Sequence, residues 1–384
     1  MHLDPAMPPL VAAIFVVLTA AMLLKTIKQP YVIAYIVAGV VIGPDGIGLV
    51  VERASIDRLG AFGIVFLLFF VGMEVSPHRL LANWRVPVIG TLLQIAASIG
   101  CVALLGALLD WPLNRIVLVG FIISLSSTAV VLKILEDRNE LETDTGADVL
   151  GVLLVQDILV VPMLVVIGLL SGDGASTTHL VLQGIGGALM VAMTAALVIR
   201  KRWRLPFANR LRVDHELQVF AALAICFGFA LISGLFELSA ALGAFFAGML
   251  IGATKETEWV HHSLHPFRVV FVSLFFLSVG MLVDLQFLLA ELPTVLGIVL
   301  AAVVTNTVVN GLSFLALGES RRSSLYGGAL LSQIGEFSFI LAAMGLAAGI
   351  VDELGYQLAI AAICVSLIVS PAWISTVRVL VGRR

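Results

Sequence analysis

The sequence is poor in charge. Lys, Arg, Asp and Glu together make up 12% of its 384 residues, whereas hydrophobic residues make up 60%. Soluble domains carry about 25% charged residues, and no soluble fold of this length could bury so much apolar surface. A membrane β-barrel is excluded because the apolar runs are continuous rather than alternating. The composition therefore predicts an all-α polytopic membrane protein.

Cysteine is also scarce, and the three present (Cys101, Cys226 and Cys364) lie in apolar runs. We expect free thiols rather than a disulfide framework. The sequence also lacks the Gly-x-Gly-x-x-Gly strand-helix unit of a nucleotide-binding domain. Its first residues, His2-Leu3-Asp4, lack the basic region of a signal peptide. We therefore interpret 1–384 as a single transmembrane transport unit that begins with a membrane helix.

Apolar runs of spanning length predict about thirteen transmembrane helices. They lie at about 8–25, 31–49, 58–76, 86–109, 113–135, 146–170, 178–199, 215–233, 238–253, 267–289, 293–317, 323–348 and 354–380. The division of 215–253 into two helices depends on a turn at Ser233–Glu237.

Basic residues orient these helices. With the N-terminus outside, all of the 22 Lys and Arg residues except Arg53, Arg58 and Arg115 fall on the cytoplasmic side. We therefore expect a multi-pass protein of the inner or plasma membrane, with its N-terminus outside and its C-terminus in the cytoplasm. The basic stretch 200–212 is interpreted as part of this signal, with anionic lipid or a regulatory domain as its alternative partners. An inner loop is expected at 261–265, where three histidines gather.

The chain contains an internal repeat at a nearly constant offset. Ala38–Gly43 recurs as Ala247–Gly252, Val71–Met73 as Val279–Met281, and Leu159–Pro162 aligns with Ile368–Pro371. The offset spans an odd number of predicted helices, so the two copies must lie inverted in the membrane. The copies occupy about 8–170 and 215–380, with 178–199 as the connector helix. Inverted repeats are typical of secondary transporters.

The repeat aligns two polar interruptions inside apolar runs. Ser124–Thr128 in the helix 113–135 matches Ser332–Glu336 in the helix 323–348. Hydroxyl groups can satisfy backbone groups freed by local unwinding, and half-helix ends present partial charges. We predict two crossed, discontinuous helices here. The alternative is a pair of unbroken helices whose serines bond to carbonyls of the preceding turn.

Asp157 lies in the middle of the apolar run Val152–Pro162, next to Gln156. An ionised carboxylate at bilayer depth costs several kcal/mol, so the group must protonate, pair with a cation, or do both in turn. We interpret Asp157 as the place where a monovalent cation and a proton exclude one another. The alternative is a permanently protonated acid bonded to a neighbouring hydroxyl. The repeat partner of Asp157 is Ser366, so the protein has one central acid.

One carboxylate that binds either a proton or a cation is sufficient for antiport, and its loaded forms are neutral. Hydroxyls and carbonyls suit a hard monovalent ion. We expect electroneutral exchange of K⁺ or Na⁺ for H⁺, with K⁺ slightly favoured, and no enzymatic activity, cofactor or nucleic-acid partner. The alternatives are a potassium-efflux system resembling a channel, which would need a filter, and a Na⁺-coupled organic-anion symporter. An intramembrane aspartyl protease would need a second, facing acid.

Several of these segments resemble the Kef-type branch of the monovalent cation:proton antiporter-2 family. The segments are Leu154–Ile158, Val161–Pro162, Leu125–Ala129, Val71–Glu74 and Gly335–Phe337. The resemblance covers essentially the whole chain and implies the sodium/proton antiporter fold, usually as a homodimer. It also implies an elevator movement of core helices, about 86–170 and 293–380, against dimerisation helices, about 8–76 and 215–289.

By the same resemblance, Asp157 carries the cation and the proton. Gln156, Ser126, Ser127 and Thr128 would lie nearby. We assign supporting positions to Glu336, Ser332, Gln333 and Glu74.

The chain departs from the pattern of the family that it resembles in two respects. Electrogenic relatives have Asp-Asp in place of Gln156-Asp157, together with a basic residue in a core helix. Kef-type efflux systems carry a cytoplasmic regulatory nucleotide-binding domain, which has no counterpart in 1–384.

Overall fold

The computed structural model describes residues 31–49, 53–74, 85–170, 214–236, 240–252 and 257–382, with isolated positions at 15–16, 19, 22, 185–186 and 189. The described residues form helices joined by turns, and this part of the chain contains no strand. The predicted all-α class is therefore confirmed. The predicted helices 8–25 and 178–199 and the basic stretch 200–212 lie largely or wholly outside the described residues.

The chain forms two compact units. The first comprises residues 1–51, 83–173 and 279–384, and the second comprises 52–82 and 174–278. The first unit contains α2 (Tyr31–Ile42), the π-helical turn η1 (Arg85–Gly90), α5 (Thr91–Leu108), α6 (Leu113–Ser124), α7 (Thr128–Asp137), α8 (Asp144–Leu170), α14 (Leu285–Ala290), α15 (Leu292–Ala316), α16 (Arg321–Leu330), α17 (Phe337–Ala347) and α18 (Glu353–Leu380).

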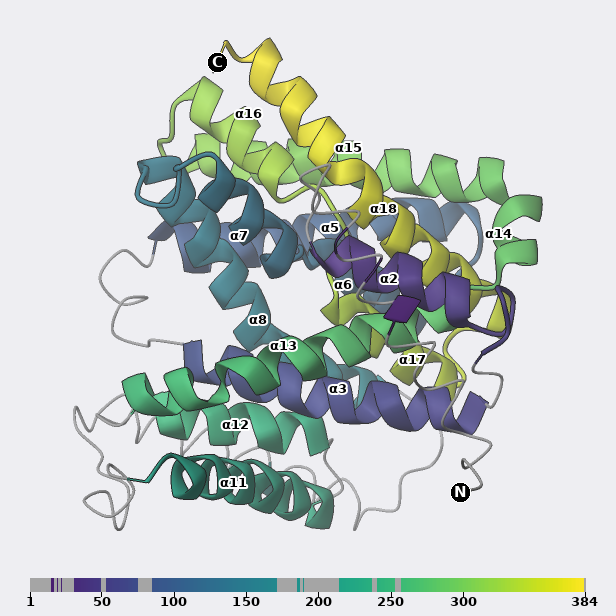
Figure 1. The fold of residues 1–384 in the computed structure, drawn as a ribbon. Helices are drawn as coiled ribbons and strands as arrows, with labels where there is room; N and C mark the ends of the chain where they lie inside the picture. The colour runs from purple at the N-terminus through teal and green to yellow at the C-terminus, as the bar shows by residue number, and fades with distance from the viewer. Residues whose placement is uncertain are drawn as a thin grey trace. The chain divides into compact units, whose positions relative to one another are not determined.

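Within the first unit, helices from the two repeats pack on one another. α5 packs against α6 and α15, α17 packs against α6 and α8, and α15 lies beside α16 and α18. Figure 1 shows α18 running through this unit to the C-terminus, with α15 and α16 beside it. The polar interruptions of both repeats therefore fall inside the same packed unit.

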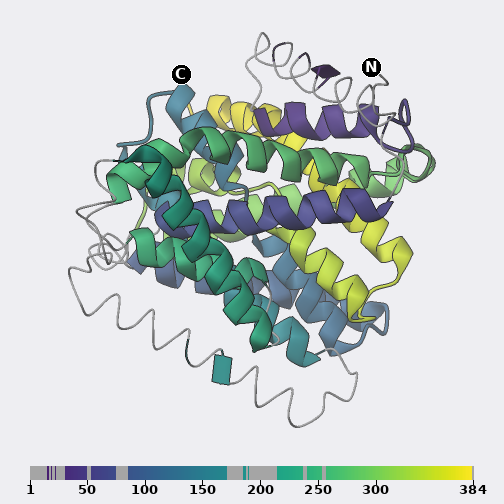
Figure 2. The same cartoon turned by 60° about the horizontal axis from the view of Figure 1, so that its bottom comes forward.

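The second unit contains α3 (Arg53–Glu74), α11 (His215–Leu235), α12 (Ala240–Gly252) and α13 (Thr257–Met281), whose last residues pass into the first unit. Figure 2 shows α3 and α13 side by side, with α11 crossing at an angle. α11 ends at Leu235 and α12 begins at Ala240, so the predicted division of 215–253 is confirmed.

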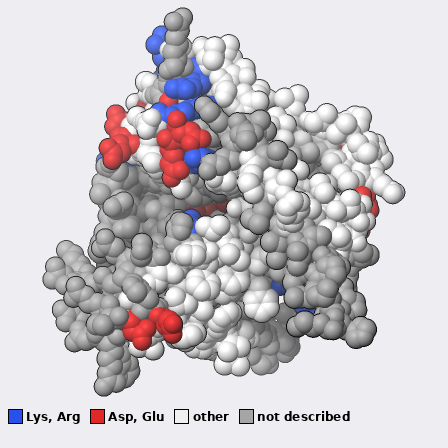
Figure 3. Space-filling view, viewed as in Figure 1, with Lys and Arg blue, Asp and Glu red and all other residues white. Residues whose placement is uncertain are grey.

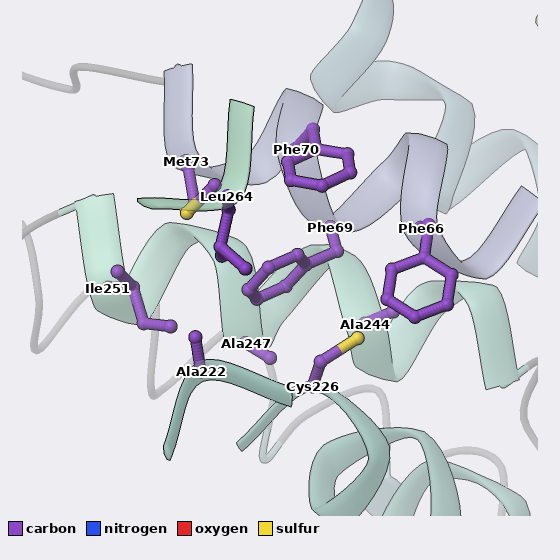
Figure 4. Packing of buried hydrophobic residues seen from close by; sticks show 10 residues of the cluster. All are labelled: Phe66, Phe69, Phe70, Met73, Ala222, Cys226, Ala244, Ala247, Ile251 and Leu264. Atoms are coloured by element: carbon purple, nitrogen blue, oxygen red, sulfur yellow. The ribbon is translucent and has the colours of Figure 1, made fainter. Parts of the chain in front are cut away.

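The core of the second unit is aromatic and aliphatic. Phe66, Phe69, Phe70 and Met73 of α3 share one buried cluster with residues of α11, α12 and α13, and Leu264 of α13 lies close to Met73 and Phe69 (Figure 4). Gly248 of α12 lies against the backbone of α3, because an added Cβ would collide with the carbonyl oxygen of Phe69. A small residue is required where two helix backbones approach this closely.

Three predicted boundaries were wrong. The single helix expected at 267–289 is α13, which ends at Met281, followed by the short α14, whose first turn is capped by Asp284. The segment 261–265, expected to be a loop, lies in the first turns of α13. The helix begins at Thr257, so it extends through polar residues before its apolar run. α2 ends at Ile42, where the turn Gly43–Gly46 follows.

Five helices among the described residues are long and apolar enough to cross a membrane. They are Arg85–Leu108, Asp144–Leu170, Glu216–Leu235, Leu292–Ala316 and Glu353–Leu380. The segments 113–137 and 321–347 are each divided into two shorter helices, as the repeat predicted. The number of thirteen spans stays a prediction.

Candidate ion-binding site at the crossing of two broken helices

The two polar interruptions meet in the first unit. α6 ends at Ser124 and α7 begins at Thr128, while α16 ends at Leu330 and α17 begins at Phe337. The backbone N–H of Gly335 donates to the carbonyl oxygen of Leu125 at 2.7 Å. The hydroxyl of Ser126 donates to the carbonyl oxygen of Leu331 at 2.8 Å. The predicted pair of discontinuous helices is therefore confirmed, and the two breaks are bonded to each other. We call these two breaks, residues 125–127 and 331–336, together with the side chains that contact them, the crossing.

Side chains satisfy further carbonyl groups that the breaks release. Ser338 Oγ donates to the Ile122 carbonyl at 2.7 Å, and Gln333 Nε2 donates to the Ser127 carbonyl at 3.4 Å. From α15, Asn306 Nδ2 donates to Ile123 O at 2.7 Å and Ser332 O at 3.2 Å. The ends of helices leave carbonyls without partners inside the helix, and in a membrane these need internal donors.

Asn306 was missed in the sequence. It had one available signal, because Asn306 and Asn310 are the only amide side chains in the otherwise apolar run of α15. An amide inside an apolar span needs internal partners, and the two carbonyls it reaches belong to different breaks. Only the folded arrangement shows which carbonyls those are.

Asp157 is buried on α8, with 3% of its surface exposed. The hydroxyl of Thr128 lies 3.3 Å and 3.1 Å from its two carboxyl oxygens. Thr128 is the first residue of α7, and Ser127 caps the same helix by accepting a hydrogen bond from Val130 N. The carboxyl group therefore lies at the N-terminal end of a half-helix, where the helix dipole stabilises negative charge.

Gln156 is fully buried beside Asp157, and its amide is engaged by other residues. Its Nε2 donates to Gln94 Oε1 at 2.7 Å and to the carbonyl of Ser124 at 3.1 Å, while its Oε1 accepts from Ser126 N at 2.9 Å. Gln156 thus bonds to both sides of the α6–α7 break. Gln94 of α5, which also donates to Ser124 O, was a second residue that the sequence reasoning missed.

The second break holds the remaining predicted residues. Glu336 is 3% exposed and immediately precedes α17, and Ser332 and Gln333 are fully buried. Within the described part of the chain, Asn306 Oδ1, Ser332 Oγ and Gln333 Oε1 have no hydrogen-bond partner. Neutral oxygens of this kind suit a water molecule or an alkali-metal ion. Glu74 is the last residue of α3, which belongs to the second unit, and its predicted supporting role stays a prediction.

The chemistry available at the crossing is that of hard oxygen ligands. The carboxylate of Asp157, the hydroxyl of Thr128 and nearby carbonyls could hold a monovalent cation, and the carboxylate could instead take up a proton. Among the described residues, no group of three or more His, Cys, Asp and Glu side chains could hold a metal ion.

A polar network lies at one end of the first unit. Arg378 of α18 pairs with Glu140 at 3.1 Å, and Tyr326 of α16 donates to Glu140 at 2.6 Å. Arg138 donates to Tyr326 Oη at 3.0 Å and to Ser375 Oγ at 2.9 Å. Figure 3 shows acidic and basic side chains gathered where α18 ends. The network fastens the α7–α8 turn to α16 and α18.

Comparison with known proteins gives a consistent match. Residues 11–379 match the model of the transmembrane sodium/hydrogen exchanger family. The chain is 36% identical over 378 residues to the iron transporter MagA of Paramagnetospirillum magneticum, covering 97% of this chain and 86% of that protein. It is 31% identical over 348 residues to K(+) efflux antiporter 4 of Arabidopsis thaliana, covering 89% of this chain and 59% of the relative.

The fold also matches a solved structure. The sodium proton antiporter MjNhaP1 of Methanocaldococcus jannaschii, solved at pH 8, superimposes with a TM-score of 0.70 over 98% of this chain and 99% of the other. Since the two sequences are 16% identical, this likeness shows the fold alone.

Proposed function

Because the chain belongs to the transmembrane sodium/hydrogen exchanger family, we propose that it is a secondary cation/proton antiporter that exchanges K⁺ or Na⁺ for H⁺ at Asp157. The resemblance to Kef-type antiporters that the sequence indicated is confirmed at the level of the family and its relatives, among them K⁺ efflux antiporters. The chain spans about three fifths of such relatives. Its own ion, stoichiometry and partners are therefore part of the proposal.

The observation that carries the proposal is the buried carboxyl group of Asp157, which lies at the N-terminal end of the half-helix α7. Asp157 has the Thr128 hydroxyl as its partner and a neutral amide, Gln156, as its chain neighbour. A buried carboxyl group that carries neither a proton nor a cation is costly. Because Asp157 must carry either a proton or a cation, binding at this one group is sufficient to couple the cation flux to the proton flux.

The proposed cycle has two neutral loaded states. On one side of the membrane, the proton leaves Asp157 and a cation replaces it beside the Thr128 hydroxyl. The site, neutral with its bound cation, then becomes accessible from the other side of the membrane, where a proton displaces the cation. The empty form crosses slowly because it would take an uncompensated charge through the membrane. Exchange is therefore one for one and electroneutral, with K⁺ slightly favoured over Na⁺.

We further propose that the crossing moves as one body in an elevator cycle. The support is that the helices of 86–170 and 293–380 share one compact unit in which the two breaks are hydrogen-bonded to each other. Because these hydrogen bonds lie within the unit, the unit can move as a whole while the geometry of the crossing is kept. The protein would work as a homodimer in the inner or plasma membrane, with its N-terminus outside, and contribute to ion and pH homeostasis.

A second candidate substrate follows from the relative named as an iron transporter, which is 36% identical to this chain. Iron ions prefer imidazole, thiolate or several carboxylates as ligands, whereas the crossing supplies one carboxylate, hydroxyls and carbonyls. This ligand set favours an alkali-metal ion. Fe²⁺ therefore belongs in the same assay as a test.

Proteoliposomes with an imposed pH gradient test the proposal. The purified protein should dissipate the gradient when Na⁺, K⁺, Li⁺ or Rb⁺ is added, and saturably so. Asp157→Asn keeps the side-chain volume but removes the titrating group, so it should abolish exchange and remain folded. Asp148→Asn, on the same helix but half-buried, is the matched control and should stay active. Robust exchange by Asp157→Asn would refute the proposal.

Voltage separates electroneutral from electrogenic exchange. Each uncompensated charge contributes about 2.3 kcal/mol per 100 mV. Exchange driven by the pH gradient should therefore be unchanged when K⁺ and valinomycin clamp the membrane potential. A current on a solid-supported membrane that scales with turnover would show a second transported charge, with Glu336 as the first residue to substitute.

A further inference from the structure

Gln94 lies at the crossing with an orientation that its partners determine. It is fully buried on α5. Its Nε2 donates to the carbonyl oxygen of Ser124 at 2.5 Å, and its Oε1 accepts from Gln156 Nε2 at 2.7 Å. A carbonyl oxygen can only accept a hydrogen bond, so the nitrogen of Gln94 must face Ser124. The oxygen of Gln94 must then face Gln156.

Gln156 is oriented in the same way. Its Nε2 meets two atoms that only accept, Gln94 Oε1 and Ser124 O, and its Oε1 meets an N–H group that only donates, that of Ser126. Both amide hydrogens and one oxygen lone pair are in use. Ser124 ends α6 and Ser126 lies in the break, so the two amides tie α5 and α8 to both sides of the break.

The bonds of Gln94 and Gln156 affect the position of the Asp157 carboxyl group. Gln156 directly precedes Asp157 on α8. Thr128, whose hydroxyl contacts the carboxyl group of Asp157, lies two residues after Ser126. The separation between Asp157 and the start of α7 therefore depends on how the break is held against α8. Besides the contact between Thr128 and Asp157, the bonds of Gln156 hold the break against α8, and Gln94 orients Gln156.

We propose that Gln94 is a positioning residue of the exchange site. Through Gln156 it holds the α6–α7 break against α8 and keeps a neutral donor next to Asp157. This inference rests on the proposed function of Asp157 as the carrier of cation and proton. It assigns Gln94 a part in that function and gives a reason why the residue next to Asp157 is a neutral amide rather than a second acid.

The reason is the polarity of the hydrogen bonds. A carboxylate in place of the Gln156 amide would turn an anionic oxygen toward Gln94 Oε1 and Ser124 O, which lie 2.7 Å and 3.1 Å from the present nitrogen. Two acceptors facing an anion are unfavourable, and only a protonated acid could donate to one of them. The Gln94 oxygen thus selects against a second ionised acid beside Asp157.

Two substitutions test the proposal. Gln94→Leu removes both bonds at similar volume. Gln94→Glu keeps the shape, and when protonated it can still donate to Ser124 O and accept from Gln156. When ionised, it places an anionic oxygen against the Ser124 carbonyl.

Few native groups would confuse this titration. α5 and α15 contain no charged residue or histidine, and α6 contains only Arg115, near its beginning. α5 also packs against η1, which contains Arg85, and against α8, which contains Asp144, Asp148 and Asp157. These groups and Glu336 are present in both variants and in the wild type, so the comparison with wild type removes their contribution.

The readout is exchange in proteoliposomes with Na⁺ and K⁺ as a function of pH. Gln94→Leu should be slower than wild type by about tenfold or more at every pH. Because burial disfavours the charged form, the introduced carboxyl group should still be protonated at about pH 5.5 and ionise as the pH rises. Gln94→Glu should therefore approach the wild-type rate at about pH 5.5 and lose about tenfold relative to wild type by about pH 8.5. Ser98→Ala is the control, because Ser98 is buried one turn further along α5 and its hydroxyl has no partner among the described residues. It should exchange at the wild-type rate.

A second measurement does not depend on transport. Hydrogen exchange of the segment 121–130, followed by mass spectrometry at a fixed pH, reports on the Ser126 amide that Gln156 holds. Gln94→Leu should raise its exchange rate by about tenfold, whereas Gln94→Glu at acid pH and Ser98→Ala should not. If the wild type exchanges none of the cations, the proposed function fails while this measurement still tests Gln94.

The proposal is overturned if Gln94→Leu leaves the hydrogen exchange of 121–130 at the wild-type rate. It is also overturned if Gln94→Glu is as impaired at about pH 5.5 as at about pH 8.5, since a packing defect would not respond to the protonation of the introduced carboxyl group.

Discussion

Gly335→Ala should separate the two broken helices. An added Cβ at Gly335 would lie 2.5 Å from the carbonyl carbon of Ser126 and 2.9 Å from the backbone nitrogen of Ser127. Both neighbours are backbone atoms of the other break, so no side chain can rotate out of the way. The breaks must move apart, and the 2.7 Å bond from Gly335 N to Leu125 O lengthens with them.

The cost follows from these two effects. Overpacking of a well-packed interior typically costs about 1–3 kcal/mol, and loss of the hydrogen bond costs about 0.5–1.5 kcal/mol. Reduced freedom of the unfolded chain offsets up to about 1 kcal/mol. The net loss in the free energy of unfolding therefore lies between about 0.5 and 4.5 kcal/mol, with about 2.5 kcal/mol at the midpoints of these ranges. Exchange should fall further because the crossing itself is distorted.

Thermal unfolding in detergent, combined with exchange in proteoliposomes, measures both effects. Gly297→Ala is the matched control, since Gly297 lies inside α15 with no heavy atom within 4 Å of an added Cβ. That variant should be as stable as wild type or slightly more so. If Gly335→Ala unfolds at the wild-type temperature and exchanges at the wild-type rate, the close approach of the two breaks is refuted.

Three further predictions concern the site and its support. Stabilisation of the protein by Na⁺ or K⁺ should weaken as pH falls, because protons and cations compete for Asp157; a thermal shift that does not vary between about pH 5 and 9 would contradict this competition. Gln156→Asp adds an acid beside Asp157, so the pH dependence of exchange should change, and voltage should matter only if the added proton is also exchanged; identical pH profiles would refute coupling between the two positions. Tyr326→Phe removes the 2.6 Å bond to Glu140 and should lower the free energy of unfolding by about 1–3 kcal/mol, which denaturation against a Phe15→Leu control would measure.

The sequence predicted the architecture well where the physics is local. Continuous apolar runs fix helices in a membrane, and the repeat located both breaks because their polar residues interrupt such runs at matching positions. The turn between α11 and α12 followed from Gly234 and Glu237 inside a long apolar stretch. The end of α13 was misplaced because Asp284 caps a new helix, an effect that hydropathy does not register.

The candidate site was predicted less completely. Asp157 and the Ser126–Thr128 segment stand out because charge and hydroxyls are rare in apolar runs, and Thr128 does reach Asp157. Gln94 and Asn306 were missed. An amide in an apolar run marks Asn306 as a polar position, but the carbonyl groups that it and Gln94 reach belong to helices distant in the sequence. Every residue has such a carbonyl, so no sequence pattern marks the ones that become available. Only the three-dimensional arrangement of the breaks identifies them.

Bonds from one broken helix to the other end on main-chain carbonyls at positions 122, 125, 127 and 331, and Asn306 of α15 adds one to position 123. Any amino acid supplies that acceptor, so a substitution at 122, 123, 125 or 331 need not break these bonds, provided the donors are kept. Ser127 is different, because its hydroxyl also caps α7. Under the proposed function, side chains around the exchanged ion could therefore be replaced one at a time while these backbone bonds persist. A change of ion preference would then need a few substitutions near Thr128 rather than a new fold. The same property makes the crossing a suitable scaffold for engineering selectivity.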